Sequence, residues 1–329
     1  MKPNLETTDY QKYKKYKTKY LELSGGGRSN KIKTGTHNNI YYEIRGNNRE
    51  TCCCLVLFSP QAAYDWDHKR EISDGKFKLI KKFNFLERLS EITQTFVYDK
   101  PELAANVAID VHQHAMQFPP INELDYESHV EKIHDVLVYT NCKPPYILVG
   151  HSMGAFNALV FAKKYPLETK AVILLDGTRH CPLMHEQTKS MFELYKTNMT
   201  DDEIQTSIQF VRNNPDLEKV IEINNYYGSQ LLKYWNQVPD KLPGIKIIGV
   251  WNIWVIEDDV YQKLSIEKKY HAQIEFLETM KQYHELLQKK NGEQYESHFF
   301  IGRSHDLHHS NMDDVINIIN NVRMMLINF

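Results

Sequence analysis

The chain has 329 residues, of which 40 are lysine or arginine and 42 are aspartate or glutamate, so its formal net charge is −2. A chain of this length can bury a large core as one unit, and its nearly balanced charge gives no reason to expect a nucleic-acid partner. There is no apolar run near the length of a membrane span, and the charged N-terminus lacks the apolar centre of a signal peptide. A cytoplasmic setting is therefore expected.

The first 27 residues differ in composition from the rest. Tyrosines and lysines form opposite faces of a helical wheel: Tyr10, Tyr13, Tyr16 and Tyr20 against Lys12, Lys15 and Lys19. Three glycines, 25–27, then break the pattern. The segment is interpreted as a solvated tail or, alternatively, as a helix that contacts a membrane surface or a partner. It also resembles leaders on proteins of giant DNA viruses, which implies host cytoplasm or a virion as the location.

Strands are expected first in the remaining domain, residues 37–329. Three short apolar runs have the length of strands: residues 40–44, 53–58 and 95–98. Apolar residues at helical spacing then predict a helix: Val130, Ile133, Leu137 and Val138. Adjacent cysteines at 52–54 point to opposite faces of a strand and cannot converge on a metal, so we expect reduced core residues.

The central motif is Tyr146–Gly154, which reads Tyr-Ile-Leu-Val-Gly-His-Ser-Met-Gly. Its apolar start predicts a parallel strand covered on both faces. Small residues at Ala155, Ala158 and Ala162 predict a helix packed close against the sheet. A serine in so tight a turn, flanked by glycines that let strand and helix approach, is typical of a nucleophile elbow.

Further elements follow the motif. The expected strands are residues 171–175, 245–250 and 297–301, and the expected helices are residues 265–289 and a final C-terminal helix. The first of these helices carries an apolar stripe at Ile266, Tyr270, Ile274, Leu277, His284 and Leu287. The final helix carries one at Val315, Ile318, Ile319, Val322 and Leu326, with Asp313 and Asp314 in its first turn. Residues 182–241 are polar and aromatic, with helical stretches and no strand.

The stretch from Pro145 to Thr178, PYILVGHSMGAFNALVFAKKYPLETKAVILLDGT, resembles the middle of an α/β-hydrolase. This resemblance implies an α/β fold of the α/β-hydrolase type, with a mostly parallel central sheet flanked by helices. It also implies that residues 182–241 are a helical cap over the active site. In the family, the catalytic residues follow the order serine, acid, histidine along the chain. The resemblance therefore implies that Ser152, at the elbow, is the nucleophile.

The segment Gly302-Arg303-Ser304-His305-Asp306-Leu307 resembles the histidine loop of the family, which implies that His305 is the base. His308 and His309 are rivals by proximity, but both lie outside the apex of that loop. A histidine cluster is also typical of metal sites. Because no carboxylate or cysteine set with ligand spacing accompanies it, we expect neither a metal nor a cofactor.

Two positions compete for the acid. Many relatives place it after the strand that is here 245–250, and the carboxylates that follow are Glu257 and Asp258, several residues later. Asp176 ends the preceding strand, where some lipases of the fold carry their acid. The sequence favours Asp176 slightly and leaves Asp258 and Glu257 as alternatives.

The oxyanion hole departs from the family pattern. One donor is expected to be the backbone N–H of Met153. The second usually comes from a glycine-rich loop, but that loop reads Ser-Pro-Gln-Ala-Ala at residues 59–63. Since Pro60 has no N–H, Gln61 or Ala62 must supply the donor. Loss of one such donor costs about a hundred- to a thousandfold in turnover.

Two functions follow from these observations. The first is a serine hydrolase that cleaves an ester, or a thioester or amide, of a small-molecule substrate through an acyl-enzyme. The alternative is a catalytically impaired binding protein on the same fold. Intact Ser152 and His305 favour the first.

Overall fold

The computed structural model describes the chain in several stretches. These are residues 32–38, 40–46, 54–58, 63–73, 76–99, 126–177, 242–254, 266–302 and 306–327. The expected leader, 1–27, and the expected cap, 182–241, lie outside them. Among the described residues, none of the helices combines the length and the apolar character that crossing a membrane requires.

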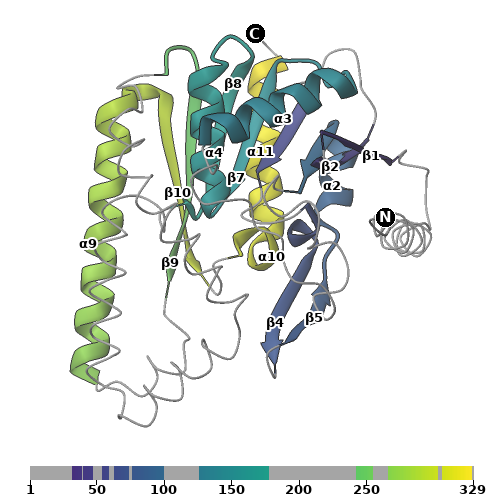
Figure 1. The fold of residues 1–329 in the computed structure, drawn as a ribbon. Coiled ribbons are helices and arrows are strands. Elements are labelled where there is room, and N and C mark those ends of the chain that lie inside the picture. The colour runs from purple at the N-terminus through teal and green to yellow at the C-terminus, as the bar shows by residue number, and fades with distance from the viewer. Residues whose placement is uncertain are drawn as a thin grey trace, which may run out of the picture.

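The centre of the molecule is a sheet of eight strands in the spatial order β1-β2-β6-β3-β7-β8-β9-β10 (Figure 1). The strands are Lys33–His37 (β1), Ile40–Arg45 (β2), Cys54–Phe58 (β3), Thr95–Tyr98 (β6), Tyr146–His151 (β7), Thr169–Leu175 (β8), Lys246–Trp254 (β9) and Tyr295–Gly302 (β10). Neighbours from β6 to β10 run parallel, whereas β2 is antiparallel to both β1 and β6. The predicted mostly parallel sheet is confirmed.

Helices cover both faces of this sheet. Figure 1 shows α3 (Tyr126–Thr140) and α4 (Met153–Lys164) on one face, with α2 (Phe85–Ile92) and α11 (Met312–Ile327) on the other. Each pair of helices encloses its own core. The final helix is confirmed with its predicted acidic first turn.

The central strand β7 contributes to both cores. Tyr146 and Leu148 pack under α3 and α4, and Ile147 and Val149 pack under α2 and α11. Successive side chains of a strand point to opposite faces, so a strand covered on both sides is a continuous apolar run. Cys54 at the start of β3 is buried and is not in a disulfide, as expected, while Cys52 and Cys53 lie outside the described residues.

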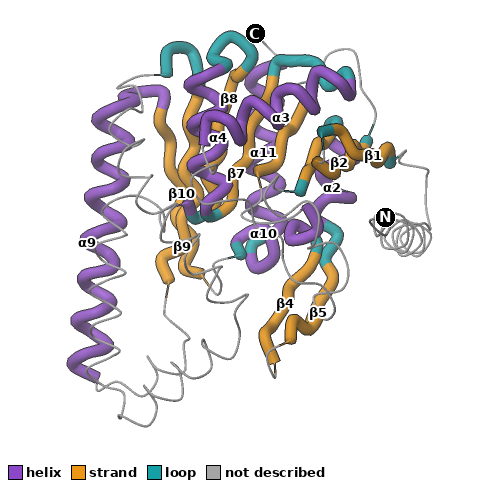
Figure 2. Tube along the Cα trace, in the orientation of Figure 1, coloured by secondary structure: helices purple, strands orange, loops and turns teal. Residues whose placement is uncertain are grey.

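Several elements were not anticipated. β1 begins at Lys33, before the expected domain start at residue 37, and α2 had not been predicted. Strands β4 (His68–Ser73) and β5 (Lys76–Lys82) form a separate two-stranded sheet, which projects away from the main sheet in Figure 2. Both strands are rich in charged residues, with four lysines in β5, and lack the apolar alternation used to predict strands. The Asp74-Gly75 dipeptide between them was the available signal, because it favours a two-residue hairpin turn.

The long helix predicted near residues 265–289 is present as α9 (Ile266–Asn291) and packs along β10. Its apolar stripe is only partly buried. Leu287 is 3% exposed, whereas Ile266 is 87% exposed, and Ile274 and Leu277 are also exposed. Helical spacing defines a face of the helix but does not supply the element that covers it. Val138, which helped to predict α3, is exposed for the same reason.

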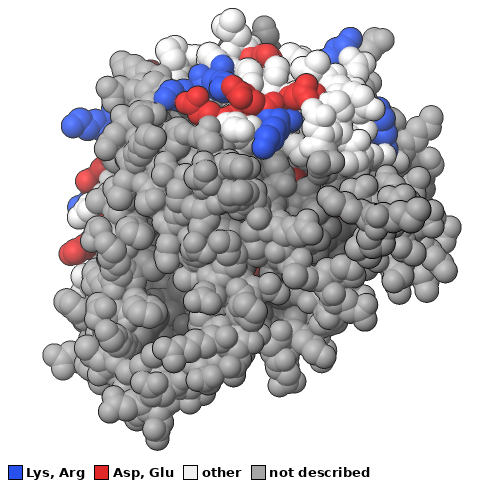
Figure 3. Space-filling model, viewed as in Figure 1, with Lys and Arg blue, Asp and Glu red and all other residues white. Residues whose placement is uncertain are grey.

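Charges of both signs alternate on the described surface near α3 and α4 (Figure 3). Lys164 of α4 forms ion pairs with two glutamates of α3, at 3.6 Å to Glu127 and also to Glu131. This arrangement agrees with the nearly balanced charge of the sequence. It contributes little to stability, since exposed ion pairs give about 0–1 kcal/mol.

Candidate active site

The turn between β7 and α4 holds Ser152 in a strained backbone conformation. Ser152 has φ 54° and ψ −122°, a region that residues other than glycine rarely adopt. The strand ends at His151 and the helix begins at Met153, so one residue connects them. The Ser152 N–H donates to the Leu175 carbonyl at 3.1 Å, which ties the turn to β8. The predicted order of strand, tight turn and helix is confirmed.

The glycines around Ser152 allow backbones to touch. A Cβ atom on Gly154 would overlap the carbonyl group of Phe58 in β3, and one on Gly150 would overlap the backbone at Ala155. Gly177, just after β8, would meet the side chain of Ala155 in the same way. The first turn of α4 is therefore enclosed by β3, β7 and β8. The predicted requirement for glycine on both sides of the serine is met.

Asp176 occupies the same position after β8 that Ser152 occupies after β7. The strand register pairs His151 with Leu175, so Ser152 and Asp176 are the next residues on adjacent parallel strands. Asp176 is 4% exposed and also has a positive φ, 44°. Its N–H donates to the Val250 carbonyl of β9 at 2.8 Å. The structure thus places one of the predicted acids beside the predicted nucleophile at the carboxyl edge of the sheet.

The alternative acids, Glu257 and Asp258, lie outside the described residues, but the strand before them is longer than predicted. β9 continues past the predicted end at Val250 to Trp254, where it still pairs with β10. Two residues, 255 and 256, therefore separate the strand from Glu257, instead of the six from 251 to 256. Their apparent distance from the strand is no longer an argument against these carboxylates.

The predicted oxyanion donors are described in part. Met153 is the first residue of α4, so its N–H is one of the four that have no partner within the helix. Gln61 lies outside the described residues, as does Ala62. The residue that follows them is fixed, because the Ala63 N–H donates to Asp99 Oδ1 at 2.9 Å. Asp99, which directly follows β6, was not recognised from the sequence as an anchor for this loop.

The predicted base, His305, also lies outside the described residues, but its rivals do not. His309 stacks on Phe83, with ring centroids 4.0 Å apart, and its Nε2 donates to the Trp66 carbonyl at 3.2 Å. His308 is 2% exposed, and its ring centroid lies 4.9 Å from that of Trp66. Both rivals are packed among aromatic rings from η1 (Ala63–Trp66) and from the segment before α2.

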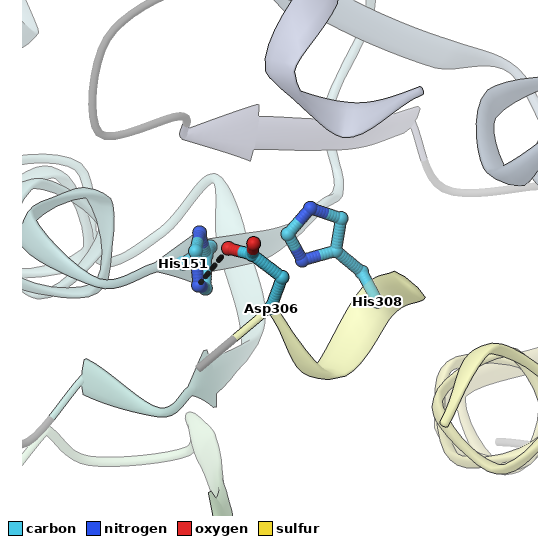
Figure 4. A group of neighbouring side chains, drawn as sticks. All are labelled: His151, Asp306 and His308. Atoms are coloured by element: carbon cyan, nitrogen blue, oxygen red, sulfur yellow. Dashed lines mark ion pairs between the residues drawn. The ribbon is translucent and has the colours of Figure 1, made fainter. Parts of the chain in front are cut away.

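His308 belongs to a cluster that joins the elbow to the histidine loop. Its ring centroid is 4.6 Å from that of His151, and His151 Nε2 is 3.7 Å from Asp306 Oδ1. Figure 4 shows the three side chains converging from the end of β7 and from the start of α10 (Leu307–Ser310). One potential ligand atom from each lies within 4.8 Å of the others. Sequence reasoning missed the cluster because it joins segments far apart in the chain.

A second group of charged side chains is buried beside η1. Arg45 donates to Glu43 Oε2 at 2.8 Å from Nη2, and to Asp67 Oδ2 at 3.4 Å from Nη1. The other oxygen of Asp67 accepts the N–H of Leu86 in the first turn of α2 at 2.9 Å. Burial raises the pKa of Asp67 to about 6, although Arg45 opposes the shift. This network, also missed from the sequence, fixes the residue after Trp66 against β2 and α2.

Comparisons with known proteins agree with this geometry. A sequence profile of the alpha/beta hydrolase fold matches residues 104–213, which include the elbow. The solved structure of AqDC has a TM-score of 0.51 at 12% identity, over 89% of this chain and 100% of that chain. The chain has the α/β-hydrolase fold.

Two other known proteins are similar to this chain, one in structure and one in sequence. VinJ has a TM-score of 0.51 at 9% identity, over 90% of this chain and 99% of that chain. An uncharacterized protein of Bacillus subtilis (strain 168), YbdG, is 38% identical over 55 residues, which is 17% of each chain. The match to YbdG thus spans much less than two thirds of that protein. AqDC is described as recognising and cleaving the ring of the Pseudomonas quinolone signal. At 12% identity, this likeness shows the fold and not the substrate.

Proposed function

We propose that the chain is a serine hydrolase that cleaves an ester, or a related thioester or amide, through an acyl-enzyme. Ser152 attacks the carbonyl carbon while His305 takes its proton and then passes it to the leaving group. Asp176 orients the imidazole and stabilises its cation, and the N–H groups of Met153 and Gln61 bind the oxyanion. Water then attacks the acyl-enzyme and releases the second product.

The observation that carries this proposal is the backbone of Ser152. A residue held in so rare a conformation costs about 1–3 kcal/mol, so the surroundings must enforce it. Here the close approaches at Gly150, Gly154 and Gly177 do so. An elbow of this kind presents a serine at the carboxyl edge of the sheet, where hydrolases of the fold react.

The geometry supports Asp176 as the acid more directly than its alternatives. It is buried at the end of the strand next to Ser152, and its backbone is held on both sides by β7 and β9 pairing. The mechanism assigns no step to a metal or a cofactor, since the imidazole, oriented by Asp176, takes the serine proton.

The proposal is tested by the hydrolysis of short-chain aryl esters. We expect His305→Ala to lower kcat by at least about a thousandfold, because the serine loses its base. His309→Ala is the matched control, and it should retain most of the activity because His309 is held by Trp66 and Phe83. Equal loss in both variants, with both folded, would show that the base has been assigned to the wrong histidine.

The three candidate acids are compared in the same assay. We expect Asp176→Asn to lower kcat far more than Asp258→Asn or Glu257→Gln, with an effect near 10⁴-fold if it removes the acid of a triad. The reverse ranking would move the acid to the segment after β9.

The second candidate is a binding protein on the same fold. It is favoured by the absence of glycine from residues 59–63, where the second oxyanion donor is expected. A well-folded wild-type protein that turns over none of the esters would favour this candidate.

A further inference from the structure

We propose that His151, Asp306 and His308 form a binding site for a divalent transition-metal ion, with Zn²⁺ as the best match. Two imidazoles and one carboxylate are a ligand set of zinc sites that keep a fourth position for water or another group. Imidazole also suits other transition metals, whereas Ca²⁺ and Mg²⁺ prefer oxygen ligands. From the sequence no metal was expected among these histidines, because His151 lies far along the chain from Asp306 and His308.

The distances are near those that a tetrahedral ion requires. Ligand atoms about 2.1 Å from zinc lie about 3.4 Å from each other. His151 Nε2 and Asp306 Oδ1 are already 3.7 Å apart. Since all three ligand atoms lie within 4.8 Å of one another, the widest pair must close by at most about 1.4 Å.

The cluster sits on rigid and buried backbone. His151 ends a central strand that is paired on both sides, with β3 and with β8. The Asp306 carbonyl accepts the N–H groups of His309 at 2.8 Å and of Ser310 at 3.0 Å, which fixes the start of α10. Ligands held in this way lose little freedom when an ion binds, which favours affinity.

Aromatic rings surround the cluster on one side. The ring centroid of His308 lies 4.9 Å from that of Trp66 and 5.7 Å from that of Phe85. The side chains of His151 and His308 are almost fully buried, and Asp306 is partly exposed. An apolar surround limits solvent access to an ion, while the Asp306 side gives it a path from solvent.

The site is distinct from the proposed catalytic residues but adjoins two of them. His151 directly precedes Ser152, and Asp306 directly follows His305. An ion would therefore connect the elbow to the histidine loop. Any effect of the ion on turnover rests on the proposed function. The test below therefore measures ion binding and not catalysis.

Binding is measured on the full, tag-free chain carrying Ser152→Ala, which removes hydrolysis from the readout. We expect one Zn²⁺ per chain by competition with a chromophoric chelator, and a visible Co²⁺ spectrum typical of four ligands. His308→Gln and Asp306→Asn should each weaken affinity by more than about 100-fold, since even an outer-shell change costs about 10–100-fold. His309→Gln is the matched control and should bind as tightly as the parent.

Asp306→Asn guards against a misfolded result, because the Asp306 side chain makes no capping hydrogen bond to α10 and asparagine keeps its size. The proposal is overturned if the parent chain binds neither ion at micromolar concentrations. It is also overturned if His305→Ala or His309→Gln loses affinity while Asp306→Asn and His308→Gln do not. In that case the ion is held by His305 or His309 instead of by the proposed cluster. None of these outcomes depends on whether Ser152 is a nucleophile.

Discussion

Helices α4 and α9 both follow apolar spacing in the sequence, yet they end in opposite environments. The first turn of α4 touches the backbone of β3, and its small residues Ala158 and Ala162 are fully buried. By contrast, α9 lies along the last strand of the sheet and leaves Ile266 and Leu277 exposed. The difference shows that residue size, as well as spacing, decides how closely a helix can approach a sheet.

The largest effect is expected where backbones touch. Gly154→Ala places a Cβ atom on the carbonyl group of Phe58, so we expect a loss of more than about 4 kcal/mol in unfolding free energy, at the extreme of single substitutions. Gly244→Ala is the control, since its φ of 75° is unfavourable for alanine but the space around it is open. That change should cost only about 1–2 kcal/mol. Urea unfolding compares the two, and equal losses would contradict the close packing of α4.

A second substitution pair compares the two helices directly. Phe161 of α4 is fully buried, and its ring packs at 5.7 Å from that of Phe58. We expect Phe161→Ala to cost about 3–5 kcal/mol and Leu277→Ala in α9 to cost less than about 1 kcal/mol. If Leu277→Ala proves as costly in thermal or urea unfolding, α9 must be covered in solution by a further element or partner.

A smaller effect on stability is expected from the buried carboxyl group of Asp67. The pKa of Asp67 is raised to about 6 by burial, from a usual value near 4. Between these pH values the folded state keeps a proton that the unfolded chain has released. Stability should therefore fall as pH rises from about 4 to about 6. Asp67→Asn should remove this slope, as measured by urea unfolding at several pH values.

The opposite slope in that experiment would mean that pairing with Arg45 outweighs burial. Asparagine keeps an acceptor for the Leu86 N–H, so the variant isolates the titration from the hydrogen bond. Parallel curves for wild type and variant would show that Asp67 does not titrate in this range.

The sequence was most informative where one short segment contains the whole geometry. Gly150, Ser152 and Gly154 lie within five residues, so the tight turn could be predicted without any distant contact. The end of β9 was harder to predict, because Asn252 interrupts the apolar run and the pairing with β10 is not visible in the sequence. The β4–β5 hairpin was missed since charged strands outside the main core lack apolar alternation.

Contacts between distant segments could not be predicted. His151 and Asp306 meet only because the carboxyl ends of β7 and β10 open on the same edge of the sheet. The same holds for Arg45 and Asp67, which come from β2 and from the segment after η1. In both cases the residue types were visible in the sequence, but their distance depends on the packing of the whole fold.

The most direct test of the central claim is labelling with a fluorophosphonate, followed by peptide mass spectrometry. This reagent reacts with a serine that has an active base and an oxyanion hole, and it needs no knowledge of the substrate. We expect wild-type protein to be labelled at Ser152, Ser152→Ala to remain unlabelled, and Gly154→Val to lose the signal through distortion of the elbow. Well-folded wild-type protein that resists the reagent would contradict the assignment of Ser152 as an activated nucleophile.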